Sequence, residues 1–294
     1  MLIAVIVTYN RLDQLRIALN ALFKSQYQPD RVIVVNNCST DLTSSWLLEQ
    51  QDILPSLLVV NLGQNLGGAG GFNVGIKTAY ELGADYVWVS DDDAYVHVDS
   101  LGALIRANDM LHKQQVISGF LCSKIIWRDG NSCYLNQPVV SDDWLDGNNI
   151  SSSLIKLQSC SFVSCLVSRT AIERVGFPIA DFFIWYDDTE YTQRLSSQFP
   201  SYLVLDSVVR HDCPENQKFS LSAINAMNSW KYYYGARNSA WVVYHNKGVV
   251  AWCVFILRQL KVMHQEQVSL KYSWGLIRSY LKALLFKPKI EASK

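Results

Sequence analysis

The stretch Tyr86-Val-Trp-Val-Ser-Asp-Asp-Asp93 decides the fold. Its first half is an apolar run typical of a buried β-strand, and three adjacent carboxylates follow it directly. Asp91 and Asp93 point the same way on extended backbone, so a hard cation such as Mg²⁺ or Mn²⁺ could relieve their mutual repulsion. The stretch therefore predicts a metal site at the end of a strand, with a solvated acidic turn as the alternative.

Similar short β-branched runs occupy 2–7, 31–35, 57–61 and 116–121. Helical patterns lie between them at 12–23 and at about 41–50, 69–82 and 99–112. This alternation predicts an α/β fold with a mainly parallel sheet. Ligands bind such sheets at the C-terminal ends of the strands. The polar residues that follow the strands are Thr8, Tyr9, Asn10, Arg11, Asn36, Asn37 and Asn65.

A glycine-rich segment, Asn65-Leu-Gly-Gly-Ala-Gly-Gly-Phe72, stands directly before a helical pattern. Such a segment permits close approach of backbone to a ligand, or forms only a tight loop and helix start. It is neither G-x-G-x-x-G after the first strand nor a Gly-Lys-Ser/Thr loop. A nicotinamide or P-loop nucleotide site is therefore not expected.

A second acidic group ends the stretch Phe182-Phe-Ile-Trp-Tyr-Asp-Asp-Thr-Glu190. A carboxylate placed by packed aromatic side chains can act as a general base toward a hydroxyl. The alternative is a helix start, where acidic residues favour the positive dipole end, and both interpretations can hold together. His211 ends a later apolar run and is either a further metal ligand or a structural histidine.

The formal net charge of zero, over 294 residues, hides two unlike segments. Residues 1–229 carry 15 basic and 24 acidic side chains, whereas residues 230–294 carry 11 basic and 2 acidic ones. Hydrophobic residues make up 49% of the chain, which excludes a disordered or collagen-like protein. The asymmetry predicts that the basic end meets an anionic partner.

The sequence pattern predicts helices after about residue 220. For residues 127–160 it predicts a loop-rich segment with short strands. Along the last helical pattern, Trp274, Ile277, Leu281, Leu284 and Leu285 share one face, and Lys271, Arg278 and Lys282 share another. A basic, Trp-containing amphipathic helix predicts contact with a membrane interface, with ordinary packing on the rest of the chain as the alternative. A nucleic-acid partner is not expected, because no zinc or helix-turn-helix signature is present.

The seven cysteines include no C-x-x-C pair, so reduced thiols in the cytoplasm are expected. The first residues, 2–7, are typical of a buried strand, so a secretory signal is not expected there. The longest uncharged stretch near the C-terminus, 248–257, is too short for the roughly 20 residues of a transmembrane helix. A membrane-spanning protein is therefore not expected.

The order of these motifs, over residues 1–245, resembles the family-2 glycosyltransferases of the GT-A fold. The glycine-rich segment and the run Phe183–Tyr191 are most similar to bacterial galactofuranosyltransferases, whereas rhamnosyltransferases share the glycine-rich segment. The resemblance implies a Rossmann-like catalytic domain over 1–220 and a basic helical C-terminal region over 221–294. A nucleotidyltransferase is disfavoured, because its first strand would be followed by a Gly-rich basic loop where this chain has Thr8-Tyr-Asn-Arg11.

The resemblance also implies residue roles. Asp188 would be the catalytic base, while Asp91 and Asp93, completed by His211, would hold Mn²⁺ or Mg²⁺ against a diphosphate. The nucleotide-sugar site would comprise Thr8, Tyr9, Arg11, Asn36, Asn65, Gly67, Gly68 and Asp92. The acceptor or sugar site would comprise Trp185, Asp187 and Glu190. Asn36 departs from the family pattern, in which many relatives carry Asp toward uracil.

The implied activity is inverting, metal-dependent transfer of galactofuranose from UDP-galactofuranose to a glycan or lipid-linked acceptor. It would serve bacterial cell-surface polysaccharide synthesis, of O-antigen or galactan type. The enzyme would work in the cytoplasm, peripherally on the inner membrane. The alternatives are a rhamnosyltransferase that uses dTDP-rhamnose and a non-catalytic module that binds sugar nucleotides.

Overall fold

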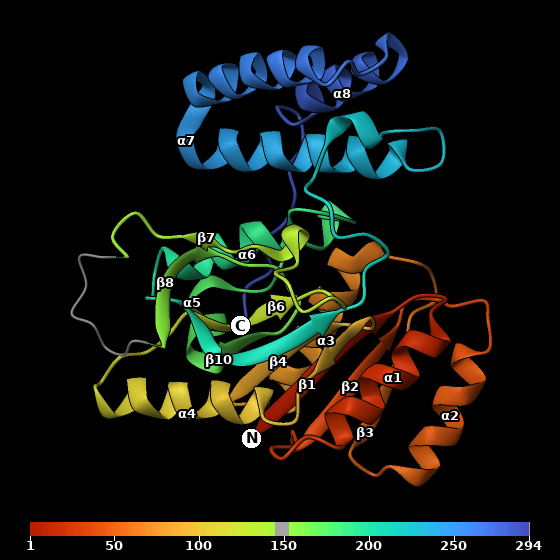
Figure 1. The fold of residues 1–294 in the computed structure, drawn as a ribbon, viewed down its shortest axis with the longest axis vertical. Helices are drawn as coiled ribbons and strands as arrows, with labels where there is room; N and C mark the ends of the chain where they lie inside the picture. The colour runs from red at the N-terminus through yellow and green to blue at the C-terminus, as the bar shows by residue number, and fades with distance from the viewer. Residues whose placement is uncertain (145–152, 294) are drawn as a thin grey trace.

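The computed structural model describes residues 1–144 and 153–293. In Figure 1 a sheet flanked by helices forms the lower part of the molecule, and a separate layer of helices lies above it. The strands are β1 (Leu2–Thr8), β2 (Arg31–Asn36), β3 (Leu57–Asn61), β4 (Tyr86–Asp91), β5 (Ala94–Val96), β6 (Phe120–Ile126), β7 (Val139–Val140), β8 (Leu154–Ser159), β9 (Cys165–Ser168) and β10 (Tyr202–His211). The α-helices are α1 (Leu12–Phe23), α2 (Thr43–Ile53), α3 (Gly67–Glu81), α4 (Ser100–Lys113), α5 (Arg169–Val175), α6 (Asp187–Ser196), α7 (Ser229–Gln265) and α8 (Leu270–Lys282).

The N-terminal half of the sheet is parallel, as predicted. Strands β3, β2, β1 and β4 are neighbours in that order, with registers such as Val5 opposite Ile33 and Val89. Both faces of β1 are buried because helices cover both sides of the sheet, which explains its continuous apolar run. Two hydrophobic clusters, one on each face, form the core.

The second half of the sheet is mixed. Strand β9 lies antiparallel between β4 and β6, β6 pairs parallel with β10, and β8 pairs antiparallel with β10. One predicted strand boundary is corrected here. The strand predicted at 116–121 is β6, which begins and ends a few residues later.

Strand β5, which was not predicted, joins the aspartate cluster to the end of β10. It begins directly after Asp93 and pairs antiparallel with the end of β10, where His211 lies opposite Ala94. The backbone N–H of Asp212 donates to the carbonyl of Asp93 over 2.8 Å. The short strand thereby brings His211 to the aspartate cluster, although 118 residues separate it from Asp93 in the chain.

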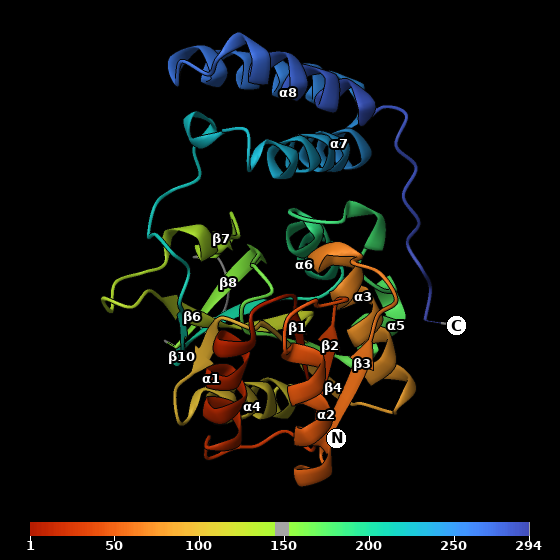
Figure 2. The same ribbon diagram turned by 90° about the vertical axis from the view of Figure 1, so that its right-hand side faces the viewer.

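The upper layer consists of α7 and α8. Helix α7 is broken at Gly248 (φ 79°, ψ −178°), and Figures 1 and 2 show its second part lying, with α8, in the layer farthest from the sheet. Helix α7 is long and apolar enough to cross a membrane by length and composition, with mean hydropathy 1.3 over its most apolar window. The apolar window is longer than the uncharged stretch of 248–257 because the widely spaced charges of the helix still leave it apolar on average. The break at Gly248 makes two shorter helices of it.

The segment after α8 returns along the outside of the sheet, as Figure 2 shows. Glu291 receives a 2.8 Å ion pair from Lys77 on α3, and its carbonyl accepts from the N–H of Phe177 at 2.9 Å. Gly176 leaves room for this segment, because a Cβ there would lie 2.4 Å from the Glu291 carbonyl oxygen. The C-terminal segment is therefore bound to the sheet half of the molecule.

Candidate functional site

Three predicted metal ligands gather where β4, β5 and β10 meet. Ligand atoms of Asp91, Asp93 and His211 all lie within 4.8 Å of one another. His211 Nε2 is 3.1 Å from Asp93 Oδ1, and its Nδ1 is 2.7 Å from Asn136 Oδ1. Nδ1 donates to Asn136, which leaves Nε2 as the nitrogen that faces the carboxylates. This is the usual arrangement of a metal-ligating imidazole.

The residues that follow β1 reach the same cluster. The Thr8 hydroxyl donates to Asp92 over 2.7 Å, and Arg11 Nη1 lies 2.5 Å from Asp93 Oδ2 and 3.4 Å from Asp92 Oδ1. Predicted residues from two neighbouring strands thus meet at one edge of the sheet. Tyr9 lies beside them and is exposed.

The cluster carries more negative charge than its surroundings readily stabilise. Burial, reinforced by the charge of Asp93, raises the pKa of Asp91 to about 6. Burial also raises the pKa of Asp92 to about 7, against the opposing charge of Arg11. Burial alone would raise the pKa of Asp93 too, but the hydrogen bond and charge of His211 lower it.

The pKa of His211 is also shifted by this cluster. Burial alone would lower its pKa, but the hydrogen bonds to Asp93 and Cys133 and the charges of Asp93 and Asp91 together outweigh burial and raise the pKa to about 10. A cluster that attracts protons and an imidazolium also attracts a divalent cation. The donor set, two carboxylates and an imidazole, fits Mn²⁺ or Mg²⁺.

Asn36 has its polar atoms occupied by protein groups. Its Nδ2 donates to Ser44 Oγ at 2.7 Å and to Asn61 Oδ1 at 2.8 Å, and its Oδ1 accepts from the Ser39 N–H. Neighbouring Asn37 binds both sides of the glycine-rich segment, accepting from Leu66 N–H and donating to the Gly67 carbonyl. The local structure thus gives Asn36 a bracing role at the end of β2.

The glycine-rich segment runs into α3, whose first residues are 67–72 of that segment. Asn65 Oδ1 accepts from the N–H of Gly67, where the helix begins. Gly67 has a φ of +71°, and a Cβ there would lie 1.9 Å from the carbonyl oxygen of Phe183. Gly68 has open space on its Cβ side. The close approach permitted at Gly67 is therefore used by the protein's own backbone, and Gly68 is the position open to a ligand.

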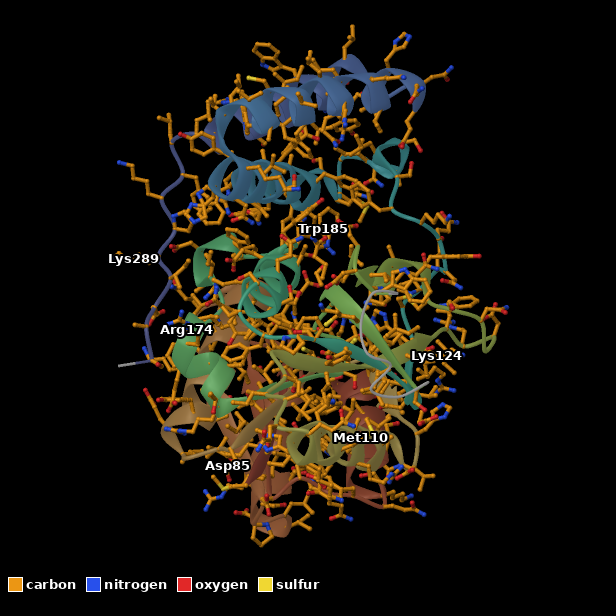
Figure 3. All side chains as sticks on the ribbon, turned by 90° about the vertical axis from the view of Figure 1, so that its left-hand side faces the viewer. Asp85, Met110, Lys124, Arg174, Trp185 and Lys289 are labelled. Carbon is orange, nitrogen blue, oxygen red and sulfur yellow. The ribbon has the colours of Figure 1, made fainter. Side chains whose placement is uncertain are left out.

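The aromatic stretch before α6 has an unusual backbone. Phe183, Trp185 and Tyr186 have positive φ angles of 66°, 64° and 70°. Non-glycine residues rarely adopt this region, and such residues concentrate where the surrounding structure holds a functional geometry. Figure 3 shows Trp185 at the level where the helical layer meets the sheet half. We refer to residues 183–186 as the left-handed segment.

Asp187 and Asp188 follow the left-handed segment as the first residues of α6. Asp188 Oδ1 accepts from the N–H of Thr189 at 2.6 Å and faces its hydroxyl at 3.2 Å. Burial raises the pKa of Asp188, and burial together with the Asp188 charge raises that of Asp187 well above its ordinary value. The Asp188 charge also raises the pKa of Asp91, so the two acidic groups lie within electrostatic reach of each other.

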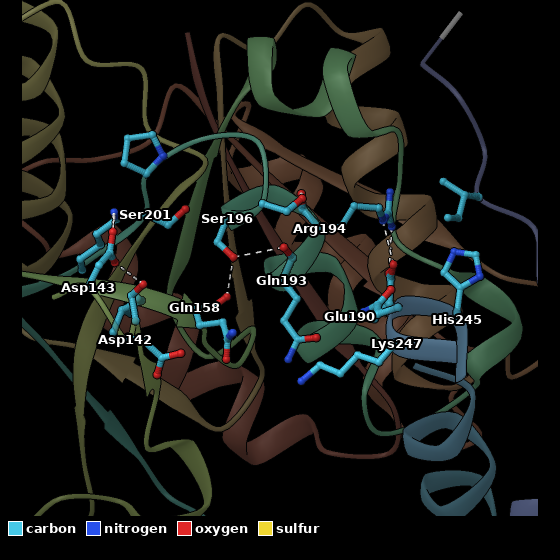
Figure 4. A pocket seen from close by; sticks show the side chains of 17 residues that line it. Asp142, Asp143, Gln158, Glu190, Gln193, Arg194, Ser196, Ser201, His245 and Lys247 are labelled. Carbon is cyan, nitrogen blue, oxygen red and sulfur yellow. Dashed lines mark hydrogen bonds and ion pairs between the residues drawn. The ribbon is translucent and has the colours of Figure 1, made fainter. Parts of the chain in front are cut away.

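Glu190 points away from this cluster. It forms a two-contact ion pair with Arg194, at 2.8 and 2.9 Å, one turn along α6. Both line a polar cavity of about 690 Å³ that Lys247 also borders, as Figure 4 shows. Asp187 and Asp188 thus lie within electrostatic reach of the carboxylate cluster, whereas Glu190 lies at this separate cavity. Trp185 packs against Phe219 and Tyr232.

Sequence reasoning did not identify several residues that shape the site. Asn136 orients His211, and Cys133 Sγ lies 3.8 Å both from His211 Nδ1 and from Cys213 Sγ. Cys133, His211 and Cys213 form a second group of possible ligands, and all seven cysteines are free. The sequence carries no signal for these contacts, because the loop of residues 127–138 reaches His211 only in the folded chain.

Known proteins resemble this chain in sequence and in fold. The family described as "Glycosyl transferase family 2" matches residues 3–175. The galactofuranosyltransferase GlfT1 of Mycolicibacterium smegmatis is 27% identical over 224 residues, which cover 71% of this chain and 70% of that protein.

Two solved structures share the fold. TarS 1–349 of S. aureus in complex with UDP-GlcNAc has a TM-score of 0.61 at 19% identity, covering 96% of this chain and 81% of that one. The mannosyltransferase PcManGT of Pyrobaculum calidifontis, in complex with GDP-Man and Mn²⁺, has a TM-score of 0.56 at 14% identity, covering 96% and 86%. At these identities the likeness is one of fold.

Proposed function

Because the chain belongs to glycosyl transferase family 2 and is a glycosyltransferase of the GT-A fold, we propose that it transfers galactofuranose from UDP-galactofuranose. The observation that carries this proposal is the meeting of Asp91, Asp93 and His211 at one sheet edge, within electrostatic reach of Asp188. The likeness to GlfT1 supports the choice of sugar.

The donor diphosphate is proposed to bind at the carboxylate cluster through a divalent cation. Asp91, Asp93 and His211 would hold Mn²⁺ or Mg²⁺, which supplies Lewis-acid neutralisation of the leaving diphosphate. Arg11 and Thr8 already contact the aspartates, and so fix their orientation before the donor arrives. Tyr9, Asn65 and the open face of Gly68 would border the nucleotide sugar, while Asn36 braces that wall.

Asp188 is proposed to take the proton of the acceptor hydroxyl as it attacks the sugar. One base is enough for inversion by direct displacement, whereas retention would require a nucleophile beneath the sugar. Burial raises the pKa of Asp188, which brings it closer to the range of an effective base at neutral pH. Trp185 and Asp187 would border the sugar or the acceptor.

A panel of nucleotide sugars tests the donor. The purified protein, with Mn²⁺ and a glycan acceptor, is expected to turn over UDP-galactofuranose faster than UDP-galactopyranose, UDP-GlcNAc or dTDP-rhamnose, as measured by release of the nucleoside diphosphate. Faster turnover of dTDP-rhamnose would make the chain a rhamnosyltransferase. Binding of a sugar nucleotide without release or transfer would make it the non-catalytic module.

The acceptor is proposed to be glycan or lipid-linked, and to be reached at the cytoplasmic face of the inner membrane. Helix α8 packs through Leu276, Ser279 and Tyr280, which are not the face predicted to be apolar. Trp274 and Leu285 of that predicted face are 70% and 84% exposed. An apolar stripe beside a basic one, both facing outward, suits a membrane interface with anionic headgroups.

Charges placed on this stripe test the membrane proposal. The double variant Trp274→Glu/Leu285→Glu is expected to lose sedimentation with vesicles containing anionic lipid, since a carboxylate is repelled from that surface. Leu48→Glu on α2, an equally non-packing position at 58% exposure, is the matched control and should sediment like the wild type. Wild-type protein that never binds such vesicles would contradict the proposal.

We also propose that the two regions of the chain have different roles. Residues 1–220 would form the catalytic domain, and residues 221–294 the basic helical region that meets the membrane. Synthesis of a bacterial cell-surface polysaccharide of O-antigen or galactan type would be the pathway served. No role in nucleic-acid binding is proposed.

A further inference from the structure

The side chain of Asn238 lies in the first part of α7 and is 0% exposed. Its Nδ2 donates to the carbonyl oxygens of Phe182 at 2.9 Å, Ile184 at 3.1 Å and Trp185 at 2.9 Å. Two amide hydrogens thus serve three carbonyls of one short stretch, of which that of Phe182 also accepts from Ile184 N–H at 2.8 Å and from Arg237 Nη2 at 3.3 Å. One helix residue therefore binds the backbone that leads to Asp187 and Asp188.

The neighbouring Arg237 fixes the orientation of this amide. Its Nε and Nη2 donate to Asn238 Oδ1 at 3.0 and 2.8 Å, so Nδ2 must face the carbonyls. Nη2 also donates to the Asp181 carbonyl at 2.9 Å, and the guanidinium lies 3.8 Å over the ring of Phe286. The pair forms a preorganised set of donors for the chain entering the left-handed segment.

The opposite side of the left-handed segment is held by α3. The carbonyl oxygen of Phe183 accepts from Ala69 N–H at 3.1 Å and lies against Gly67. Trp185 packs against Gly235, where a Cβ would lie 2.7 Å from its ring. Positive φ angles at bulky residues persist only when the surroundings over-determine them, and here α3 and α7 do so from two sides.

We propose that Asn238 is a positioning residue, whose amide holds the left-handed segment so that Asp188 faces the carboxylate cluster. The inference rests on the proposed role of Asp188 as base. It assigns the helical layer a part in the reaction as well as any contact with a membrane.

The substitution Asn238→Asp tests the proposal with almost no change in volume. It replaces the donating amide by an oxygen that faces three carbonyl oxygens. We expect kcat for transfer to fall at least about tenfold, since small displacements of a reacting group are costly. The affinity for UDP with Mn²⁺, measured by calorimetry, should stay within about twofold of wild type, because its site lies on β1, β4 and β10.

Hydrogen exchange supplies a readout that does not depend on activity. In Asn238→Asp the amides of residues 183–190 should exchange faster, while those of β1 and β4 keep their protection. Asn73→Asp is the matched control, because buried Asn73 likewise donates to a backbone carbonyl, that of Pro178 at 2.7 Å. It should leave both kcat and exchange over 183–190 near wild type.

Each outcome decides the matter. Unchanged kcat and unchanged exchange in Asn238→Asp would overturn the proposal. A second variant, Asn238→Ser, keeps one donor. If both variants lost protection uniformly over the whole chain and also lost UDP affinity, the proposal would likewise be overturned. Recovery of part of kcat in Asn238→Ser relative to Asn238→Asp would support it. If the wild type transfers no sugar at all, the proposed function fails, while the exchange comparison still tests whether Asn238 orders the segment.

Discussion

The variant Asp188→Asn is expected to lose transfer by at least about 100-fold, the scale of lost acid–base assistance. The amide keeps the volume of the carboxylate and can still accept from Thr189, so the start of α6 should be preserved. It cannot take a proton from the acceptor. Single-turnover transfer measures the loss, and calorimetry with UDP and Mn²⁺ should show the affinity for nucleotide retained.

Two companions make this result specific. Asp206→Asn removes an exposed carboxylate on β10, outside the site, and should leave transfer near wild type. Asp187 is the neighbouring candidate, and burial together with the charge of Asp188 raises its pKa as well. Near wild-type turnover in Asp188→Asn, with a severe loss in Asp187→Asn, would transfer the role of base to Asp187.

Removal of the metal is expected to have the second large effect. Chelation with EDTA should abolish transfer, and Mn²⁺ or Mg²⁺ should restore it, because nothing else in the described residues offers two converging carboxylates and an imidazole for the diphosphate. Asp93→Asn should raise the Mn²⁺ concentration needed for half-maximal activity by at least about tenfold. Mn²⁺ binding followed by electron paramagnetic resonance gives the affinity directly.

A carboxylate that is unrelated to the cluster controls this experiment. Asp129→Asn changes an exposed loop position whose side chain bonds only to Asn131 among the described contacts, so the metal requirement should not move. Full transfer activity in excess EDTA would contradict the proposed metal site. In that case Arg11 and His211, in place of a metal ion, would be the positive charges that neutralise the diphosphate.

Local pattern was sufficient to predict the first half of the fold. Strands such as β1 and β4 are continuous apolar runs, and α1 shows one apolar stripe, so their periods are visible in the sequence. The four residues of β9 and the three of β5 are too short to carry a period. Their direction is decided by the strands they pair with, and β9 accordingly lies antiparallel to both of its neighbours.

The carboxylates and His211 could be anticipated from their order along the chain, because each follows an apolar run. The hydrogen-bond partners that surround each of these side chains could not be anticipated in this way. Asn136 and Asn238 act on segments 75 and more than 50 residues away, through contacts that exist only after folding. The same reason explains Glu190, which spacing grouped with Asp188 but which α6 turns toward Arg194.

The return of the chain after α8 has a consequence for synthesis on the ribosome. Lys289 N–H donates to Asp181, and Glu291 binds Lys77 and Phe177, on elements that are made much earlier. These contacts close the sheet half only after residue 291 has left the exit tunnel. The elements around Gly176 therefore remain partly uncovered until residues 289–291 have been made. Nascent chains stalled within α8 should be more sensitive to protease around Gly176 than the released protein.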